Sequence, residues 1–77
     1  MAVSELRALR EKKGSLRDAE ARTGISRGLL SKYERGLVSS PTYDKVVRLA
    51  EYLDVTPTHC IRLIEAARKQ AANGRAS

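Results

Sequence analysis

The stretch Ser15–Gly36, SLRDAEARTGISRGLLSKYERG, has the local signals for two short helices joined by a tight turn. Ser15 and Ser26 precede the two helices, where a hydroxyl can accept a hydrogen bond from a free N–H group of the first turn. Gly24 can adopt the left-handed backbone conformation that a break between helices requires, and Gly36 ends the second helix. The two predicted helices are Leu16–Arg22 and Arg27–Arg35.

Apolar and basic residues fall on different sides of the second predicted helix. Leu30 and Tyr33 are three residues apart and should point inward, and Leu29 should do so in part. The other side carries small and basic residues, namely Arg27, Gly28, Ser31, Lys32 and Arg35. A helix of this kind can enter the major groove of DNA while the preceding helix crosses the phosphate backbone. The stretch therefore predicts a small sequence-specific DNA-binding protein.

The composition is consistent with one small helical domain that binds a polyanion. The 77 residues suffice for a single domain, residues 1–77, and 42% of them are hydrophobic, which argues against disorder. The net charge of +6 attracts polyanions, so DNA, RNA and anionic lipid are all candidates. Residues 1–35 contain 9 basic and 5 acidic side chains, against 6 and 4 in residues 36–77, so the excess lies around Ser15–Gly36. A charge that only keeps the protein soluble is the alternative.

The sequence also excludes several classes of protein. Cys60 is the single cysteine, so an internal disulfide or a cysteine-based zinc site cannot form, and a reducing compartment fits best. No apolar run approaches the ~20 residues that span a bilayer, and Glu5, Arg7 and Arg10 interrupt any signal-peptide core. We expect a cytoplasmic protein of a bacterial cell or phage-infected host, associated with the nucleoid and without a membrane partner.

Three further helices complete the predicted fold. The first covers Ser4–Lys13 and ends at Gly14. Its apolar side holds Val3, Leu6 and Leu9, and its other sides hold Arg7, Arg10 and Glu11. The fourth starts near Ser40 or Thr42, and its apolar stripe is Val46, Leu49, Ala50 and Leu53. The fifth covers Pro57–Ala72, capped by Thr56, and a flexible tail of residues 73–77 follows it.

The fifth predicted helix has a wider apolar face than a terminal helix needs to contact a small core. Its apolar positions include Cys60, Ile61, Ile64, Ala67 and Ala71. We expect this face to contact a second copy of the chain, because a domain of this size buries a limited core by itself. The alternative is an ordinary core helix.

The residues that follow a known family pattern lie between about positions 3 and 57. They are Leu6, Leu9-Arg10, Ser15-Leu16-Arg17, Arg22–Ser26, Leu30–Gly36, Pro41, Leu49-Ala50 and Leu53-Asp54-Val55. In these residues the chain resembles the lambda-repressor-like helix-turn-helix family, also called the Cro/repressor or xenobiotic-response-element type. The resemblance implies an all-α fold, a compact bundle of five helices with the helix-turn-helix at residues 15–36.

Two residues depart from the family pattern. Glu20 stands where alanine is usual, and we expect its carboxylate to reach an arginine or a helix cap. Leu16 stands where a polar residue is usual, which would leave the phosphate contact there to Arg17 or to the backbone N–H groups behind Ser15.

The resemblance also implies which residues contact DNA. The predicted base-reading residues are Arg27, Gly28, Leu29 and Lys32. Arg27 is the first choice, because a guanidinium can donate two hydrogen bonds to guanine O6 and N7; the alternative is that Arg27 and Lys32 contact only phosphate. The predicted phosphate contacts are Ser15, Arg17, Ser31, Arg35, Ser39, Ser40 and Tyr43. For Ser15 the alternative is a helix cap, and for Arg35 it is a surface ion pair with Glu34 or another carboxylate. We expect Glu34 not to touch DNA.

Proteins of this family usually bind as two-fold dimers on inverted repeats, so the expected partners are double-stranded DNA and a second copy of the chain. The predicted function is a small repressor of the phage or mobile-element type. An antitoxin or another protein-interaction module with the same fold is the alternative, and non-specific binding of nucleic acid or membrane is disfavoured because a long basic amphipathic stripe is missing.

The sequence offers little for catalysis or cofactor binding. His59 and Cys60 are neighbours and would point apart on a helix, and no spaced set of metal ligands or glycine-rich phosphate loop is present. We therefore expect no enzyme activity, no cofactor, no metal and no small-molecule ligand.

Overall fold

A computed structural model describes the backbone of residues 4–76 and the side chains of residues 4–72. Its elements are α1 (Glu5–Lys13), α2 (Leu16–Thr23), α3 (Arg27–Glu34), α4 (Tyr43–Leu53) and α5 (Pro57–Ala76). The all-α five-helix fold predicted from the sequence is confirmed. Val3 and Ser77, which the predictions include, lie outside the described residues.

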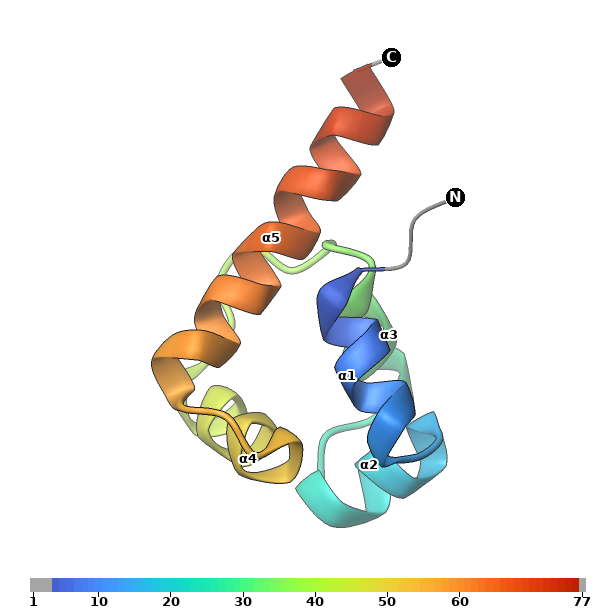
Figure 1. The fold of residues 1–77 in the computed structure, drawn as a ribbon, viewed down its shortest axis with the longest axis vertical. Coiled ribbons are helices and arrows are strands. Elements are labelled where there is room, and N and C mark those ends of the chain that lie inside the picture. Colours follow the sequence, from blue (N-terminus) through green and yellow to red (C-terminus); the bar gives the residue numbers. More distant parts are fainter. Residues whose placement is uncertain (1–3, 77) are drawn as a thin grey trace.

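The longest helix, α5, forms one side of the molecule, and α1, α3 and α4 pack against it (Figure 1). Both α1 and α4 pack on α5, whereas α2 packs on α3 and α4. The C-terminal part of α5 extends past the other helices (Figure 1). This arrangement leaves α3 between α2 and α5, with one of its sides turned away from the core.

The core is built from the apolar stripes that helical periodicity predicts. Its buried hydrophobic residues are Leu6, Ala19, Ile25, Leu30, Tyr33, Val46, Leu49, Ala50, Leu53, Cys60, Leu63, Ile64 and Ala67. Ile25, in the turn between α2 and α3, is 2% exposed. It holds the two helices together at their junction, because removing such a side chain from water stabilises the fold by about 1.5–3 kcal/mol.

Serine caps begin the first three helices as predicted. The hydroxyls of Ser4, Ser15 and Ser26 each accept a backbone N–H three residues later, at 3.2 Å. Asp18 completes a capping box, because its carboxylate accepts the backbone N–H of Ser15 at 3.0 Å. These bonds satisfy N–H groups that a helix start leaves free.

Two glycines end the helices of the central pair. Gly24 has φ +76° and its N–H donates to the carbonyl of Glu20 at 2.9 Å. Gly36 has φ +73°, and a Cβ there would overlap the backbone of Ala67 in α5. The end of α3 can therefore lie directly against α5 only because position 36 has no side chain.

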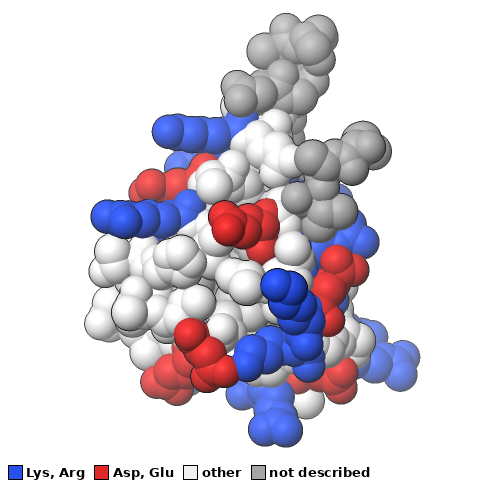
Figure 2. Space-filling model, in the orientation of Figure 1, with Lys and Arg blue, Asp and Glu red and all other residues white. Residues whose placement is uncertain are grey.

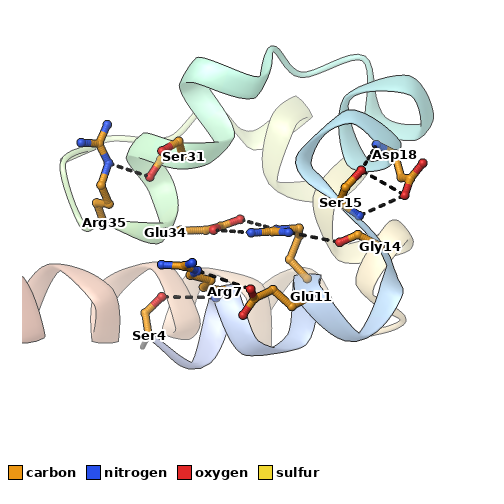
Figure 3. A network of polar contacts seen from close by, with 10 residues as sticks. Ser4, Arg7, Glu11, Gly14, Ser15, Asp18, Ser31, Glu34 and Arg35 are labelled. Atoms are coloured by element: carbon orange, nitrogen blue, oxygen red, sulfur yellow. Dashed lines mark hydrogen bonds and ion pairs between the residues drawn. The ribbon is translucent and has the colours of Figure 1, made fainter. Parts of the chain in front are cut away.

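One buried ion pair joins α1 to α3. Arg10 donates from Nε to Glu34 Oε2 at 2.8 Å and from Nη2 to Glu34 Oε1 at 3.1 Å. Its third group, Nη1, donates to the carbonyl of Gly14 at 3.1 Å. Both side chains are under 10% exposed, and Figure 3 shows Glu34 pointing between α3 and α1. The hydrogen bond with Glu34 raises the pKa of Arg10 further above its already high value, so the guanidinium stays charged.

The prediction that Arg10 lies away from the apolar side of α1 is therefore wrong. Arg10 is four residues after Leu6, on the same side of the helix, and is 7% exposed. It is buried because Glu34 and the carbonyl of Gly14 compensate its charge there.

The predicted end of the last helix is also corrected. The helix α5 continues to Ala76, four residues beyond the predicted end at Ala72. Its C-terminal segment is rich in alanine, and no proline follows Pro57 to interrupt it.

We predict that Arg10→Met lowers the free energy of unfolding by about 3 kcal/mol, because Glu34 is left charged and unpaired in the core. Urea unfolding followed by circular dichroism measures this. The double variant Arg10→Met/Glu34→Leu should recover at least half of the loss. A single variant as stable as the original chain would contradict the structural role of the pair.

Candidate nucleic-acid interface

The outer side of α3 presents most of the predicted base-reading residues to solvent. Arg27, Gly28 and Lys32 are exposed, and Gly28 and Lys32 are four residues apart, one above the other on the helix. Leu29 is half-buried and packs against the core, so only part of its side chain is available. The cationic outer side of α3 is therefore accessible to a ligand.

Gly28 has no structural reason within the fold to be glycine. A Cβ built at this position meets nothing within 4 Å, and its φ lies outside the left-handed region. Glycine inside a helix costs roughly 0.5–1 kcal/mol relative to alanine. A small residue there leaves room for a surface from outside the chain to approach the α3 backbone.

Arg27 is held by a carboxylate from α2. Its Nε lies 3.2 Å from Glu20 Oε1, and its backbone N–H donates to Glu20 Oε2 at 3.2 Å. The expectation that Glu20 reaches an arginine or a cap is confirmed in both forms. The Arg27 side chain remains about half exposed, at 51%.

The helices before and after α3 in the sequence, α2 and α4, also begin with residues that are predicted to contact phosphate. At the start of α2, the hydroxyl of Ser15 is already used, because it accepts the N–H of Asp18 and donates to the Asp18 carboxylate at 3.1 Å. Hydrogen bonds from backbone N–H and hydroxyl of Ser15 hold the pKa of Asp18 below its usual value. Ser15 thus acts as a helix cap. In the same turn, the side chain of Arg17 is exposed and accessible to a ligand.

At the start of α4, Thr42 is the N-cap residue but makes no side-chain cap hydrogen bond. The first residue of that helix, Tyr43, is 74% exposed. Free N–H groups at a helix start suit phosphate oxygens, and a phenolic hydroxyl can donate to the same group. The start of α4 therefore leaves N–H groups without a side-chain cap, whereas the start of α2 is closed by a capping box.

The remaining predicted phosphate contacts lie at and after the end of α3. Ser31 is half-buried, and its carbonyl accepts a hydrogen bond from Arg35 Nε at 3.4 Å (Figure 3). Ser39 and Ser40 are exposed, and the carbonyl of Ser39 accepts from Arg68 at 3.4 Å. Within the residues whose side chains are described, Arg35 pairs neither with Glu34, which is buried with Arg10, nor with another carboxylate, so this alternative is wrong.

Some basic side chains on this surface are paired with a carboxylate and others are not. Within residues 4–72, neither Arg17 nor Lys32 forms an ion pair, whereas Arg27 is paired with Glu20. The face of the molecule that Figure 2 shows carries basic and acidic groups interspersed. Unpaired cations on the α2–α3 side are free to neutralise phosphate.

Most of the predicted subunit contact is occupied by the chain's own core. Cys60, Ile64 and Ala67 are at most 3% exposed and pack against the other helices. The prediction that these three residues contact a second copy of the chain is therefore wrong, because α1 and α4 already cover that face of α5. Ile61 is 37% exposed and Ala71 is half-buried, so these two remain accessible.

The residues that could suggest catalysis are kept apart. His59 is exposed, whereas Cys60 is fully buried, and burial raises the pKa of its thiol to about 11. Among the residues whose side chains are described, no three His, Cys, Asp or Glu residues group as metal ligands. In the same part of the chain, no helix has the length and apolar character needed to cross a bilayer.

Two capped helices joined at Gly24, the second with an exposed outer side, define a helix-turn-helix DNA-binding domain. A family model described as Helix-turn-helix matches residues 6–59. The chain belongs to this lambda-repressor-like helix-turn-helix family, which consists of DNA-binding transcription regulators. No curated protein sequence and no solved structure gives a significant match.

We predict that Gly28→Ala separates folding from DNA binding. The free energy of unfolding of the variant should be about 0.5 kcal/mol higher, because alanine favours the helix and its methyl group meets no neighbour. Its affinity for a preferred duplex should fall, because the added methyl group lies where the duplex approaches. Urea unfolding and fluorescence anisotropy measure the two effects; unchanged affinity would remove Gly28 from the interface.

Proposed function

We propose that the protein is a sequence-specific repressor that inserts α3 into the major groove of an operator. The observation that carries the proposal is the outer side of α3, where Gly28 leaves the backbone open between the exposed Arg27 and Lys32. A repressor of this kind acts in the cytoplasm by occupying DNA that the transcription machinery needs. We propose a regulator of the phage or mobile-element type.

Base recognition is assigned to the first turns of α3. Arg27 donates to guanine O6 and N7, Lys32 makes a less directional contact, and the exposed part of Leu29 meets a thymine methyl group. Phosphate contacts are assigned to Arg17, to Tyr43 and the free N–H groups at the start of α4, and to Arg35. Ser31, Ser39 and Ser40 are secondary phosphate contacts near the end of α3.

The proposal includes a two-fold dimer on an inverted repeat. A helix of 8 residues is only about 12 Å long, so its side chains reach few base pairs. Two copies with half-sites about 34 Å apart would double the sequence that is read. The exposed part of the predicted α5 contact, Ile61 with the half-buried Ala71, is the proposed meeting point.

Selection of bound sequences from random duplexes tests the proposed function. We expect enrichment of an inverted repeat that contains guanine in each half-site. Equal binding of all sequences would contradict sequence-specific recognition, and the absence of binding to any duplex would favour the alternative of a protein-interaction module.

We predict that Arg27→Ala and Arg17→Ala weaken binding in different ways. Arg27→Ala should reduce the preference for one base pair in each half-site, which is worth about 1–3 kcal/mol for a bidentate contact. Arg17→Ala should weaken binding to all duplexes alike and lower the slope of log affinity against log salt by about 1 per contact. Anisotropy titrations at several salt concentrations distinguish the two. A uniform loss for Arg27→Ala would assign it to phosphate.

We predict that Ile61→Asp lowers the dimer affinity and leaves the fold intact, because this side chain is partly exposed. Ile64→Asp should instead unfold the chain, because it places a carboxylate in the core. Sedimentation and circular dichroism of both variants provide the measurement. An unchanged dimer in Ile61→Asp would show that the two copies meet elsewhere.

A further inference from the structure

Both carboxylate oxygens of Glu20 contact the same residue, Arg27, which is the first residue of α3. Its Oε2 accepts the backbone N–H of Arg27, and its Oε1 lies 3.2 Å from Nε of the same residue. A single carboxylate from α2 thus holds both the main chain and the side chain of the first residue of α3.

The first of these bonds has an evident structural purpose. The first turn of α3 contains no acidic residue of its own, and Ser26 caps only the N–H of Leu29. A carboxylate at this end satisfies another free N–H and suits the positive end of the helix dipole. The contact to Nε is not needed for this purpose.

The second contact, the ion pair at Nε, leaves the other N–H groups of the Arg27 guanidinium available to donate hydrogen bonds. A guanidinium is planar and rigid, so a carboxylate held beside Nε restrains the position of the whole group. The two terminal Nη groups remain free, and their parallel N–H bonds match guanine O6 and N7. Adenine presents an amino donor where guanine has O6, and donor would then face donor.

The same carboxylate also works against contact with phosphate. Glu20 is 41% exposed and lies beside the cation, so it reduces the positive potential that Arg27 offers to any DNA backbone. Lys32 and Arg17, which form no ion pair within residues 4–72, are not affected in this way.

We infer that Glu20 determines specificity: it positions Arg27 to read guanine and lowers the affinity for DNA of any other sequence. The inference depends on the proposed function, in which α3 enters the major groove. Glu20 is a positioning residue, since it acts through Arg27 and not through a contact with a base.

The test compares the original chain with Glu20→Ala, Glu20→Gln and Glu11→Gln. Glu11 is the matched control, because it forms a comparable exposed ion pair with Arg7 within α1. Each protein is titrated by anisotropy against its selected duplex, against the same duplex with the read guanine replaced by adenine, and against a random-sequence duplex. Urea unfolding is measured in parallel.

Glu20→Ala should lose discrimination between guanine and adenine by roughly fivefold or more, which lies within the range of a bidentate contact. It should also bind the random duplex more tightly than the Glu11→Gln control. Glu20→Gln keeps one acceptor and should lie between Glu20→Ala and the original chain. In an Arg27→Ala background, Glu20→Ala should have no further effect on discrimination.

A Glu20→Ala variant that is less stable but discriminates as well as the original chain would overturn the inference and leave Glu20 as a cap. A loss of discrimination that persists in the Arg27→Ala background would also overturn it, because Glu20 would then act by another route. An original chain without any base preference would instead overturn the proposed function, and this inference with it.

Discussion

The buried ion pair between Arg10 and Glu34 is the constraint on which the rest of the structure depends. It joins the end of α1, the α1–α2 turn through the carbonyl of Gly14, and the end of α3. A charged group in the core must be compensated, so both partners must stay in place once either is buried. With Glu34 held inward, α3 cannot rotate about its axis, and Gly28 and Lys32 face solvent.

The end of α3 is constrained a second time by Gly36. Its lack of a side chain lets the turn lie against the backbone of Ala67, so α3 is held by α1 on one side and α5 on the other. Rigid support at one end of a helix is what a reading surface requires, because base contacts depend on positions within fractions of an ångström.

The cations of the candidate interface separate into two kinds. Arg27 is restrained and partly neutralised by Glu20, whereas Arg17 and Lys32 form no ion pair in the described part of the chain. Free cations contribute mainly to sequence-independent affinity, and a restrained guanidinium contributes mainly to discrimination between bases. Affinity and specificity would then be supplied by different residues of one small surface.

Local features of the fold were predictable from the sequence. The caps at Ser4, Ser15 and Ser26 and the break at Gly24 depend on hydrogen bonds within a few residues, so short-range patterns predict them. The spacing of apolar residues also predicted which side of each helix is buried, because this spacing depends only on the local helical repeat. The exposure of Arg27 also follows from its place at the start of an amphipathic helix.

Features that depend on distant partners were not predictable in this way. Arg10 lies at the apolar spacing from Leu6, but only the position of Glu34, 24 residues later, makes its burial favourable. Periodicity likewise showed that Cys60 and Ile64 lie on an apolar face of the last helix. It could not show that α1 and α4 cover that face in place of a second copy.

The central claim is that α3 and the adjoining helix starts contact DNA. An NMR titration of the backbone amides with a duplex chosen by selection tests it most directly. The account predicts that the largest shifts occur at Arg27–Lys32, at Arg17 and at Tyr43, with small changes in α1 and α5. Shifts confined to α5, or no shifts on adding a duplex in excess, would contradict it.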